Sequence, residues 1–337
     1  MADNATSRGK NYSIIAVLGM FSFLTALSGS STNLAIPKIA IDMDISSSMA
    51  TWIVQIGLIT TAILLVMFGH IGDILSKNVV FLAGGIGFLI GSAITGFAPN
   101  FPIILFGRVI QAIGSAMIMA NSMGIVTQYF PDKRRAEALA VISMFISVGS
   151  ISGPGIGGLI ISASSWRWIY WINVPLGIVI LWLGFKFLPI PKESWAHVRQ
   201  VTQGANWTGQ NLFTLGIIIF FLSGSFFQAG RSKLLTGIIF FAVGGVIALY
   251  AFIQDDKANL PWIAPEVIHN RGFMTSITAL ALVMLVNSVS NILLPFYFQS
   301  YNGMSAFYSG LIIMLQSVTM LCTTPFAGYL ADRINRE

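Results

Sequence analysis

Residues 138–161, ALAVISMFISVGSISGPGIGGLII, decide the fold, because this stretch contains no charged residue. A helix rises about 1.5 Å per residue, so roughly 20 apolar residues cross the hydrocarbon core of a bilayer. The run is long enough to cross, and its apolar residues are continuous, whereas those of a membrane barrel strand would alternate with polar ones. We therefore predict that this stretch forms one transmembrane helix.

The composition of the whole chain agrees with a membrane protein. Of 337 residues, 55% are hydrophobic and 9% are charged, whereas about 25% are charged in an average soluble domain. A disordered chain, a soluble enzyme and a nucleic-acid-binding protein are excluded, since the basic residues behind the net charge of +6 lie scattered in short loops. The single cysteine, Cys322, cannot form an internal disulfide, and no Cys/His spacing resembles a metal site. We expect no metal and no cofactor.

Similar apolar runs follow one another along the chain and predict an all-α polytopic membrane protein with about ten transmembrane helices. Most of the 18 Lys and Arg residues fall in loops on the side of the N-terminus, so we expect a multi-pass protein of the cell membrane with a cytoplasmic N-terminus. The predicted spans are residues 12–36, 50–70, 79–98, 102–128, 137–161, 168–188, 208–227, 234–254, 273–298 and 306–330.

Two passages of the chain are repeated. Residues 33–37 (NLAIP) match residues 291–295 (NILLP), and residues 69–73 (GHIGD) match residues 328–332 (GYLAD) at almost the same separation. Coincidence is the alternative, but a parallel repeat is how many transporters are built, with the substrate site between the two halves.

The repeat predicts three parts of the chain. Residues 1–190 form an N-terminal six-helix half, residues 191–272 a cytoplasmic linker with two inserted helices, and residues 273–337 the first two helices of an incomplete C-terminal half. A complete second copy would bring the total to fourteen helices, so we expect roughly the last four to be missing. A fragment, a frameshift and a broken gene are the possible origins.

Several motifs resemble the major facilitator superfamily, in particular its fourteen-helix drug:proton antiporter branch. The resemblance implies a facilitator fold and export of small amphipathic compounds or drugs by alternating access. The passages are residues 27–37 (LSGSSTNLAIP), 69–77 (GHIGDILSK), 108–114 (RVIQAIG), 149–158 (GSISGPGIGG) and 166–177 (WRWIYWINVPLG).

Four polar residues inside the spans are candidates for the path of substrate or protons: Asn33, Arg108, Gln111 and Asn291. Arg108 carries a charge that is costly in lipid, so it should face a wet cavity or a partner, unless it snorkels to the outer interface. Gln111 is one turn away and can bond with Arg108 or with substrate. The two asparagines occupy matching positions in the repeat.

Other residues are candidates for conformational change. Gly149, Gly153 and Gly157 recur every four residues and share one helix face, and we expect Pro154 to lie on that same face and to bend the helix. With Gly158 they predict a bending interface, and static helix packing is the alternative. In the family this helix meets the opposite half, and we expect most of its partners there to be among the missing helices.

A second conformational element is expected at the cytoplasmic ends of two spans. Asp73 and Asp332 could each form a latch with a helix N-terminus or a basic residue, and Arg333 follows the second aspartate. Gly69, one turn before Asp73, would allow a neighbour to approach closely. The family pattern has a basic residue where this chain has Ile74, which weakens the first latch.

The coupling ion is the open point of this interpretation. None of the 12 acidic residues lies in the middle of a predicted span, and Ser28 stands where the branch usually has an aspartate. A proton-coupled exporter of small molecules is our first hypothesis, with an uncoupled facilitator and a non-transporting remnant as alternatives. We expect a monomer whose partners are the lipid bilayer, the substrate and, in the proton-coupled case, H⁺. We do not expect an enzyme, since no catalytic cluster lies in the membrane.

Overall fold

The computed structural model describes residues 2–190, 207–228, 231–256, 270–315 and 318–319, and these residues form helices without a strand. The helices are α1 (Ala2–Asp42), α2 (Ser47–Ile74), α3 (Lys77–Phe97), α4 (Phe101–Tyr129), α5 (Asp132–Ala163), α6 (Trp168–Trp171), α7 (Asn173–Phe187), α9 (Trp207–Gln228), α10 (Leu234–Asp256) and α12 (Arg271–Phe296). A 3₁₀ turn (Arg231–Lys233), a π-helix (Tyr297–Tyr301) and a short apolar helix (Ala306–Leu315) complete them.

Nine helical segments within the described residues are long and apolar enough to cross a membrane. They correspond to the first nine predicted spans and confirm a multi-pass, all-helical membrane protein. The predicted tenth span starts with the helix Ala306–Leu315 and then continues outside the described residues. The sixth span consists of α6 and α7, which are separated at Ile172.

The end of the first span was predicted wrongly. We expected it at residue 36, but α1 continues to Asp42 with Pro37 inside the helix. A proline removes one backbone hydrogen bond and bends a helix without always ending it. Trp166 Nε1 donates to the Asp42 carboxylate over 3.0 Å, and Arg167 Nη1 pairs with the same oxygen over 3.1 Å. These contacts hold the extended end of α1 to the loop before α6.

Capping residues mark where several helices begin. The side chain of Ser46 accepts a hydrogen bond from the backbone N–H of Met49 at the start of α2. Asn100 accepts in the same way from Ile103 at the start of α4, and Asn270 from Phe273 at the start of α12. Each cap satisfies one of the free N–H groups at a helix N-terminus, so short polar residues between apolar runs set these boundaries.

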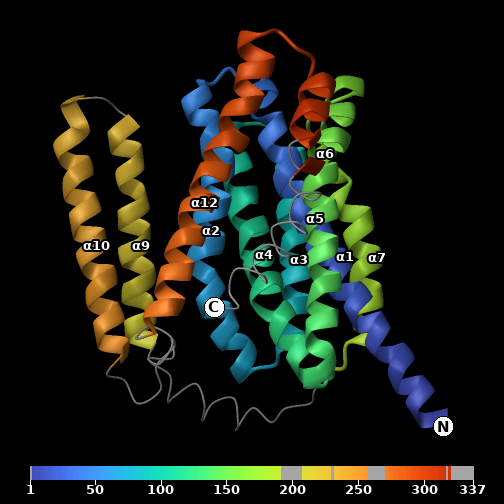
Figure 1. Cartoon of the computed structure of the whole chain (residues 1–337). Coiled ribbons are helices and arrows are strands. Elements are labelled where there is room, and N and C mark those ends of the chain that lie inside the picture. Colours follow the sequence, from blue (N-terminus) through green and yellow to red (C-terminus); the bar gives the residue numbers. More distant parts are fainter. Residues whose placement is uncertain (1, 191–206, 229–230, 257–269, 316–317, 320–337) are drawn as a thin grey trace, which may run out of the picture.

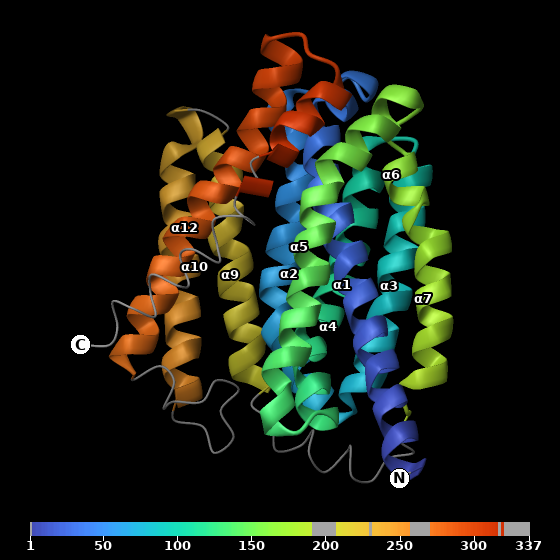
Figure 2. The ribbon, with the colours of Figure 1, turned by 45° about the vertical axis from the view of Figure 1, so that its right-hand side comes forward.

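Helices α1 to α7 form one bundle, as Figures 1 and 2 show. Within it α3 packs on α4, α1 packs on α5, and α2 packs on α4. Phe21, Phe81 and Phe88 are fully buried in its core, and the rings of Phe21 and Phe81 meet edge to face at 5.5 Å. We name the end of the bundle with the turn between α2 and α3 the proximal end, and the end with the turn between α1 and α2 the distal end.

Helices α9 and α10 form a hairpin beside this bundle, and α9 contacts α2 (Figure 1). Helix α12 runs from the proximal to the distal end and approaches the bundle at its distal end (Figure 2). Its residues 271–286 are exposed, whereas Pro295 is buried and Leu294 and Phe296 pack against the distal core. The contact between α12 and the first bundle is therefore concentrated at the distal end.

Candidate functional site

A cavity of about 530 Å³ lies between the first bundle and α12. This volume is in the range of pockets that hold drug-sized ligands, roughly 300–1,000 Å³. Its apolar walls include Val54, Leu58, Phe88, Met119, Ile146 and Ile292, and its polar groups include Ser28, Asn33, Thr61, Arg108, Gln111, Ser115 and Asn291. The lining residues come from α1, α2, α3, α4, α5 and α12.

Arg108 lies two turns into α4 and is only 9% exposed. Its Nε donates to the backbone oxygen of Ile53 in α2 over 2.9 Å, and its Nη1 donates to Oε1 of Gln111. The guanidinium carbon lies 6.0 Å from the centre of the Tyr170 ring, at the limit of a cation–π contact. The side chain thus lies at the cavity in this structure and does not snorkel to the distal surface.

Gln111 connects Arg108 to a buried network from three other helices. Its Nε2 donates to Ser28 of α1 over 3.2 Å and to Ser92 of α3 over 2.8 Å. Asn173 of α7 donates to Ser28 over 3.0 Å. The groups in this network are neutral. Ser28 stands where the drug:proton antiporter branch usually has an aspartate, and its hydroxyl accepts two hydrogen bonds.

The sequence reasoning missed part of this network. Ser92 and Asn173 were not predicted as site residues. A weak signal was present, because each is a polar residue within an otherwise apolar run. The run alone does not tell which way such a residue points, so the grouping of Ser28, Ser92, Gln111 and Asn173 required the structure.

A glycine contact between α3 and α4 makes the network possible. A Cβ at Gly91 would overlap the backbone nitrogen of Gln111, and a Cβ at Gly114 would overlap the backbone of Phe88. Only glycine lets these two backbones approach so closely. The close approach places Gln111 beside Ser92 on the neighbouring helix.

The repeated asparagines both reach the cavity, Asn33 from α1 and Asn291 from α12. Asn291 Nδ2 donates to Oδ1 of Asn287 over 2.6 Å. The Oδ1 atom of Asn33 is buried and accepts no hydrogen bond from the described residues. The structure therefore brings all four predicted pathway residues to one cavity; their roles remain predictions.

The glycine-rich part of α5 uses two faces. Gly149, Gly153 and Gly157 pack on α1, where Ser31 Oγ donates to the Gly153 carbonyl over 2.9 Å. The Pro154 carbonyl and Gly158 instead face the helix Ala306–Leu315. We expected Pro154 on the face of the three glycines; this was wrong, because neighbouring residues of a helix point about 100° apart.

The second face of α5 closes the distal end against the later part of the chain. A Cβ at Gly158 would lie 2.5 Å from the carbonyl oxygen of Ala306, and one at Gly310 would overlap the Pro154 carbonyl. The backbone N–H of Phe307 donates to Ser162 Oγ over 3.1 Å. We name this contact between residues 154–162 and 306–310 the distal seam. The seam gives this helix one partner in the later part of the chain; that most of its partners lie in missing helices stays a prediction.

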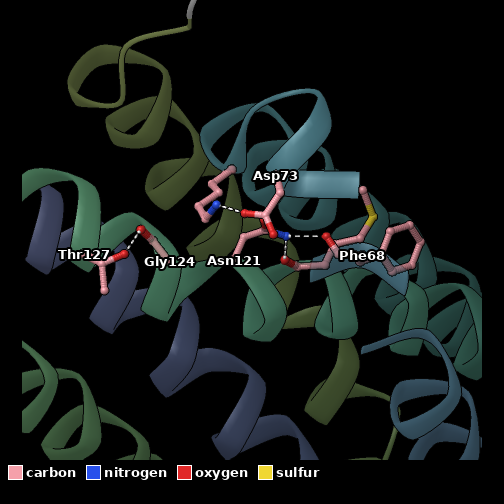
Figure 3. A network of polar contacts seen from close by, with 7 residues as sticks. Phe68, Asp73, Asn121, Gly124 and Thr127 are labelled. Carbon is pink, nitrogen blue, oxygen red and sulfur yellow. Dashed lines mark hydrogen bonds and ion pairs between the residues drawn. The ribbon is translucent and has the colours of Figure 1, made fainter. Parts of the chain in front are cut away.

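The proximal end contains the predicted latch residue Asp73, which forms an ion pair with Lys77 at the start of α3 (Figure 3). The Asp73 carboxylate is 63% exposed, so the pair is a surface contact. A Cβ at Gly69 would meet no described atom within 4 Å, so the expected close approach does not occur there within the described residues. Asp332 and Arg333 lie outside the described residues.

The close contact at this end is made by Gly72 and Asn121 instead. Asn121 Nδ2 donates to the backbone oxygens of Phe68 over 3.2 Å and Met117 over 2.9 Å. A Cβ at Gly72 would overlap the Asn121 side chain. The contacts of Asn121 with Phe68 and with Gly72 join α2 to α4, and Asn121 was not predicted as a site residue.

Comparisons with known proteins address the family. The family description Major Facilitator Superfamily matches residues 18–337. The riboflavin transporter RibZ of Clostridioides difficile is 29% identical over 321 residues, covering 95% of this chain and 67% of RibZ. The multidrug transporter protein MdtP of Bacillus subtilis is 28% identical over 333 residues, covering 97% and 59%. The lincomycin resistance protein LmrB of Listeria monocytogenes is 28% identical over 324 residues, covering 95% and 66%.

The chain therefore spans between 59% and 67% of the length of these three relatives. Among solved structures, the peptide transporter POT in complex with sulfate superposes with a TM-score of 0.62 at 12% identity. That match covers 96% of this chain and 69% of the other. At this low identity the superposition shows a shared fold.

Proposed function

The chain belongs to the Major Facilitator Superfamily, and from this membership we propose that it exports small amphipathic compounds by alternating access. The family and the relatives named above are transporters and not enzymes. The cavity between the first bundle and α12 is the observation that carries the proposal. Its mostly apolar walls and few polar groups suit a substrate with an apolar body and a polar group.

Alternating access requires contacts that can separate, and the distal seam supplies them. It joins α5 to residues 306–310, while Gln299 in the π-helix donates to the Leu34 carbonyl of α1 over 3.0 Å. The proximal half of α12 is exposed. We propose that the seam and the Gln299 contact break when the cavity opens to the distal side, and that Asp73 acts at the proximal end. Asp332 and Arg333 lie outside the described residues and stay proposed latch residues.

The membrane arrangement is part of the proposal. We place the protein in the cell membrane as a monomer with a cytoplasmic N-terminus, and we assign it to the fourteen-helix branch. The hairpin of α9 and α10 beside the bundle supports two inserted helices between a six-helix half (1–190) and a second half that starts at residue 273. The names of MdtP and LmrB support export of drug-like compounds.

Proton exchange is the proposed driving force, and the motif resemblance in α5 supports it. A second candidate is an uncoupled facilitator. The cavity favours this candidate, because the described residues that line it include no Asp, Glu or His and a proton-coupled site needs a group that binds and releases H⁺.

Transport by the full chain in proteoliposomes tests the function. The probe is dansylglycinamide, a neutral fluorescent amphipath, and protein-free liposomes are the control. We expect saturable efflux from the protein-containing vesicles. Acceleration of efflux by an imposed pH gradient supports proton exchange. Counterflow at the same rate with and without a pH gradient supports the facilitator. Efflux no faster than from protein-free liposomes contradicts transport and supports the non-transporting alternative.

A further inference from the structure

We propose that the cavity selects amphipathic anions, namely compounds with an apolar body and one carboxylate or similar oxyanion that Arg108 binds. This inference rests on the proposed function, since it assigns the substrate class of the same cavity. It starts from the charges of the cavity wall. Arg108 is the one charged side chain among the described lining residues.

The charge of Arg108 is not compensated by the described protein. Its two hydrogen-bond acceptors are the backbone oxygen of Ile53 and the amide oxygen of Gln111, and both are neutral. A buried cation without a counter-charge is unfavourable within a membrane. An anionic ligand would supply the missing charge, whereas a cationic ligand would add a second positive charge to a poorly solvated site.

The geometry leaves donors available for such a ligand. A guanidinium carries five N–H donors in a planar fork, and the described residues accept from Nε and Nη1. Nη2 lies 2.9 Å from the place where a Cβ of residue 57 would be, and Gly57 itself lines the cavity. The absence of a side chain at Gly57 keeps this edge of the guanidinium accessible. A carboxylate can accept two parallel hydrogen bonds here, one from Nη2 and one from the second N–H of Nη1.

The remaining wall accommodates an apolar body. Leu58, Phe88, Met119 and Ile146 line the same cavity as Arg108, and its volume of about 530 Å³ suits a molecule with one aromatic ring system. The site therefore combines one cationic anchor with an apolar chamber.

Three probes with one fluorophore test the charge preference: dansylglycine (anionic), dansylglycinamide (neutral) and dansylethylenediamine (cationic). Their dissociation constants are measured by fluorescence on the purified full chain in detergent. We expect dansylglycine to bind at least about tenfold more tightly than the other two. Arg108→Gln should abolish this preference, and Arg108→Lys should retain part of it. Lys186→Gln, which removes an exposed charge outside the cavity wall, should leave it unchanged.

Equal affinities, a preference for the cation, or no saturable binding of dansylglycine to the unmodified protein would each overturn the inference. These outcomes need no variant, so a misfolded Arg108→Gln protein does not remove the test. Efflux of the same probes from proteoliposomes separates the two proposals. A charge preference in binding without efflux contradicts the transport function alone, and equal efflux of all three probes contradicts the anion preference alone.

Discussion

Gln111 shows how one side chain can join three helices. It accepts from Arg108, donates to Ser28 and Ser92, and is 2% exposed. A buried polar group that loses its partner costs about 1–3 kcal/mol. The hydrogen bonds of the amide oxygen and the amide nitrogen therefore stabilise the folded bundle. The sequence shows that Gln111 lies one turn from Arg108, but not that two serines from other helices complete its bonds.

Two substitutions of Gln111 separate its effect on protein stability from the effect of charge on ligand binding. Gln111→Leu removes the bonds to Arg108, Ser28 and Ser92, and we expect it to lower the free energy of unfolding by about 1–3 kcal/mol. Gln111→Glu keeps an acceptor for Arg108 and adds a negative charge, so it should abolish the preference for dansylglycine. Thermal unfolding in detergent and probe binding measure the two effects. A glutamate variant that still prefers the anion would contradict the electrostatic argument.

At the proximal end, two glycines of α2 form a matched pair. A Cβ at Gly72 would overlap the Asn121 side chain, whereas a Cβ at Gly69 would meet no described atom within 4 Å. Alanine is favoured over glycine in a helix by about 1 kcal/mol, and overpacking costs typically about 1–3 kcal/mol. We therefore expect Gly72→Ala to be destabilising by up to about 2 kcal/mol and Gly69→Ala to be neutral or stabilising.

Thermal unfolding of both glycine variants in the same detergent gives the comparison. If Gly72→Ala were as stable as Gly69→Ala, Asn121 would not hold α2 against α4 as closely as described.

At the scale of elements, the sequence predicts which segments are helices better than it predicts their faces. Nine spans are confirmed because long uncharged apolar runs have few alternatives in a membrane. The continuation of α1 beyond Pro37 was missed, since proline is compatible with both a kink and an end. The two faces of α5 were also missed, because the repeat of Gly149, Gly153 and Gly157 predicts a packing face without naming the helix that packs there.

The distal seam provides a test of movement between elements. The Ser162 side chain lies 3.1 Å from the backbone nitrogen of Phe307, so in a Cys322→Ser background Ser162→Cys and Phe307→Cys put two cysteines on closely spaced backbone positions across the seam. Oxidation should join them and hold the seam closed, so we expect efflux of dansylglycinamide to stop. Reduction should restore it, because the block is one covalent bond.

Each single-cysteine variant, treated with the same oxidant, is the control for that experiment. Full efflux by the cross-linked protein, with the disulfide verified by mass spectrometry, would show that the seam does not open during transport.

For the molecule as a whole, the repeat predicts more of the site than composition does. Asn33 and Asn291 are far apart in the chain, and their shared motif led us to place both at one cavity, where the structure has them. The neutral network and the distal seam could not be derived in this way. They depend on contacts between segments that share no motif, such as Ser92 with Gln111 and Gly158 with Ala306.

The charge of the cavity has a consequence for the energy source of the whole transporter. Arg108 stays in the protein and is back in its starting position after each transport cycle. The net charge that crosses the membrane with an uncoupled substrate is therefore the charge of the substrate. A monoanion leaving a negative compartment gains about 2.3 kcal/mol per 100 mV, or about a fiftyfold concentration ratio. We therefore predict that a negative-inside K⁺ diffusion potential, set with valinomycin at equal pH, accelerates efflux of dansylglycine from proteoliposomes.

The neutral dansylglycinamide is the control for this measurement. Without proton coupling its efflux moves no net charge and should not respond to the potential, and with one inward proton it moves one charge where dansylglycine moves two, so in both cases it should respond less than dansylglycine. Coupling to one inward proton leaves the direction of this response unchanged, since an anion moving out and a cation moving in displace charge in the same sense. A pH gradient without a potential then decides between the candidates: acceleration indicates proton exchange, and no response indicates the facilitator. Equal responses of the two probes to the potential would contradict the transport of dansylglycine as an anion.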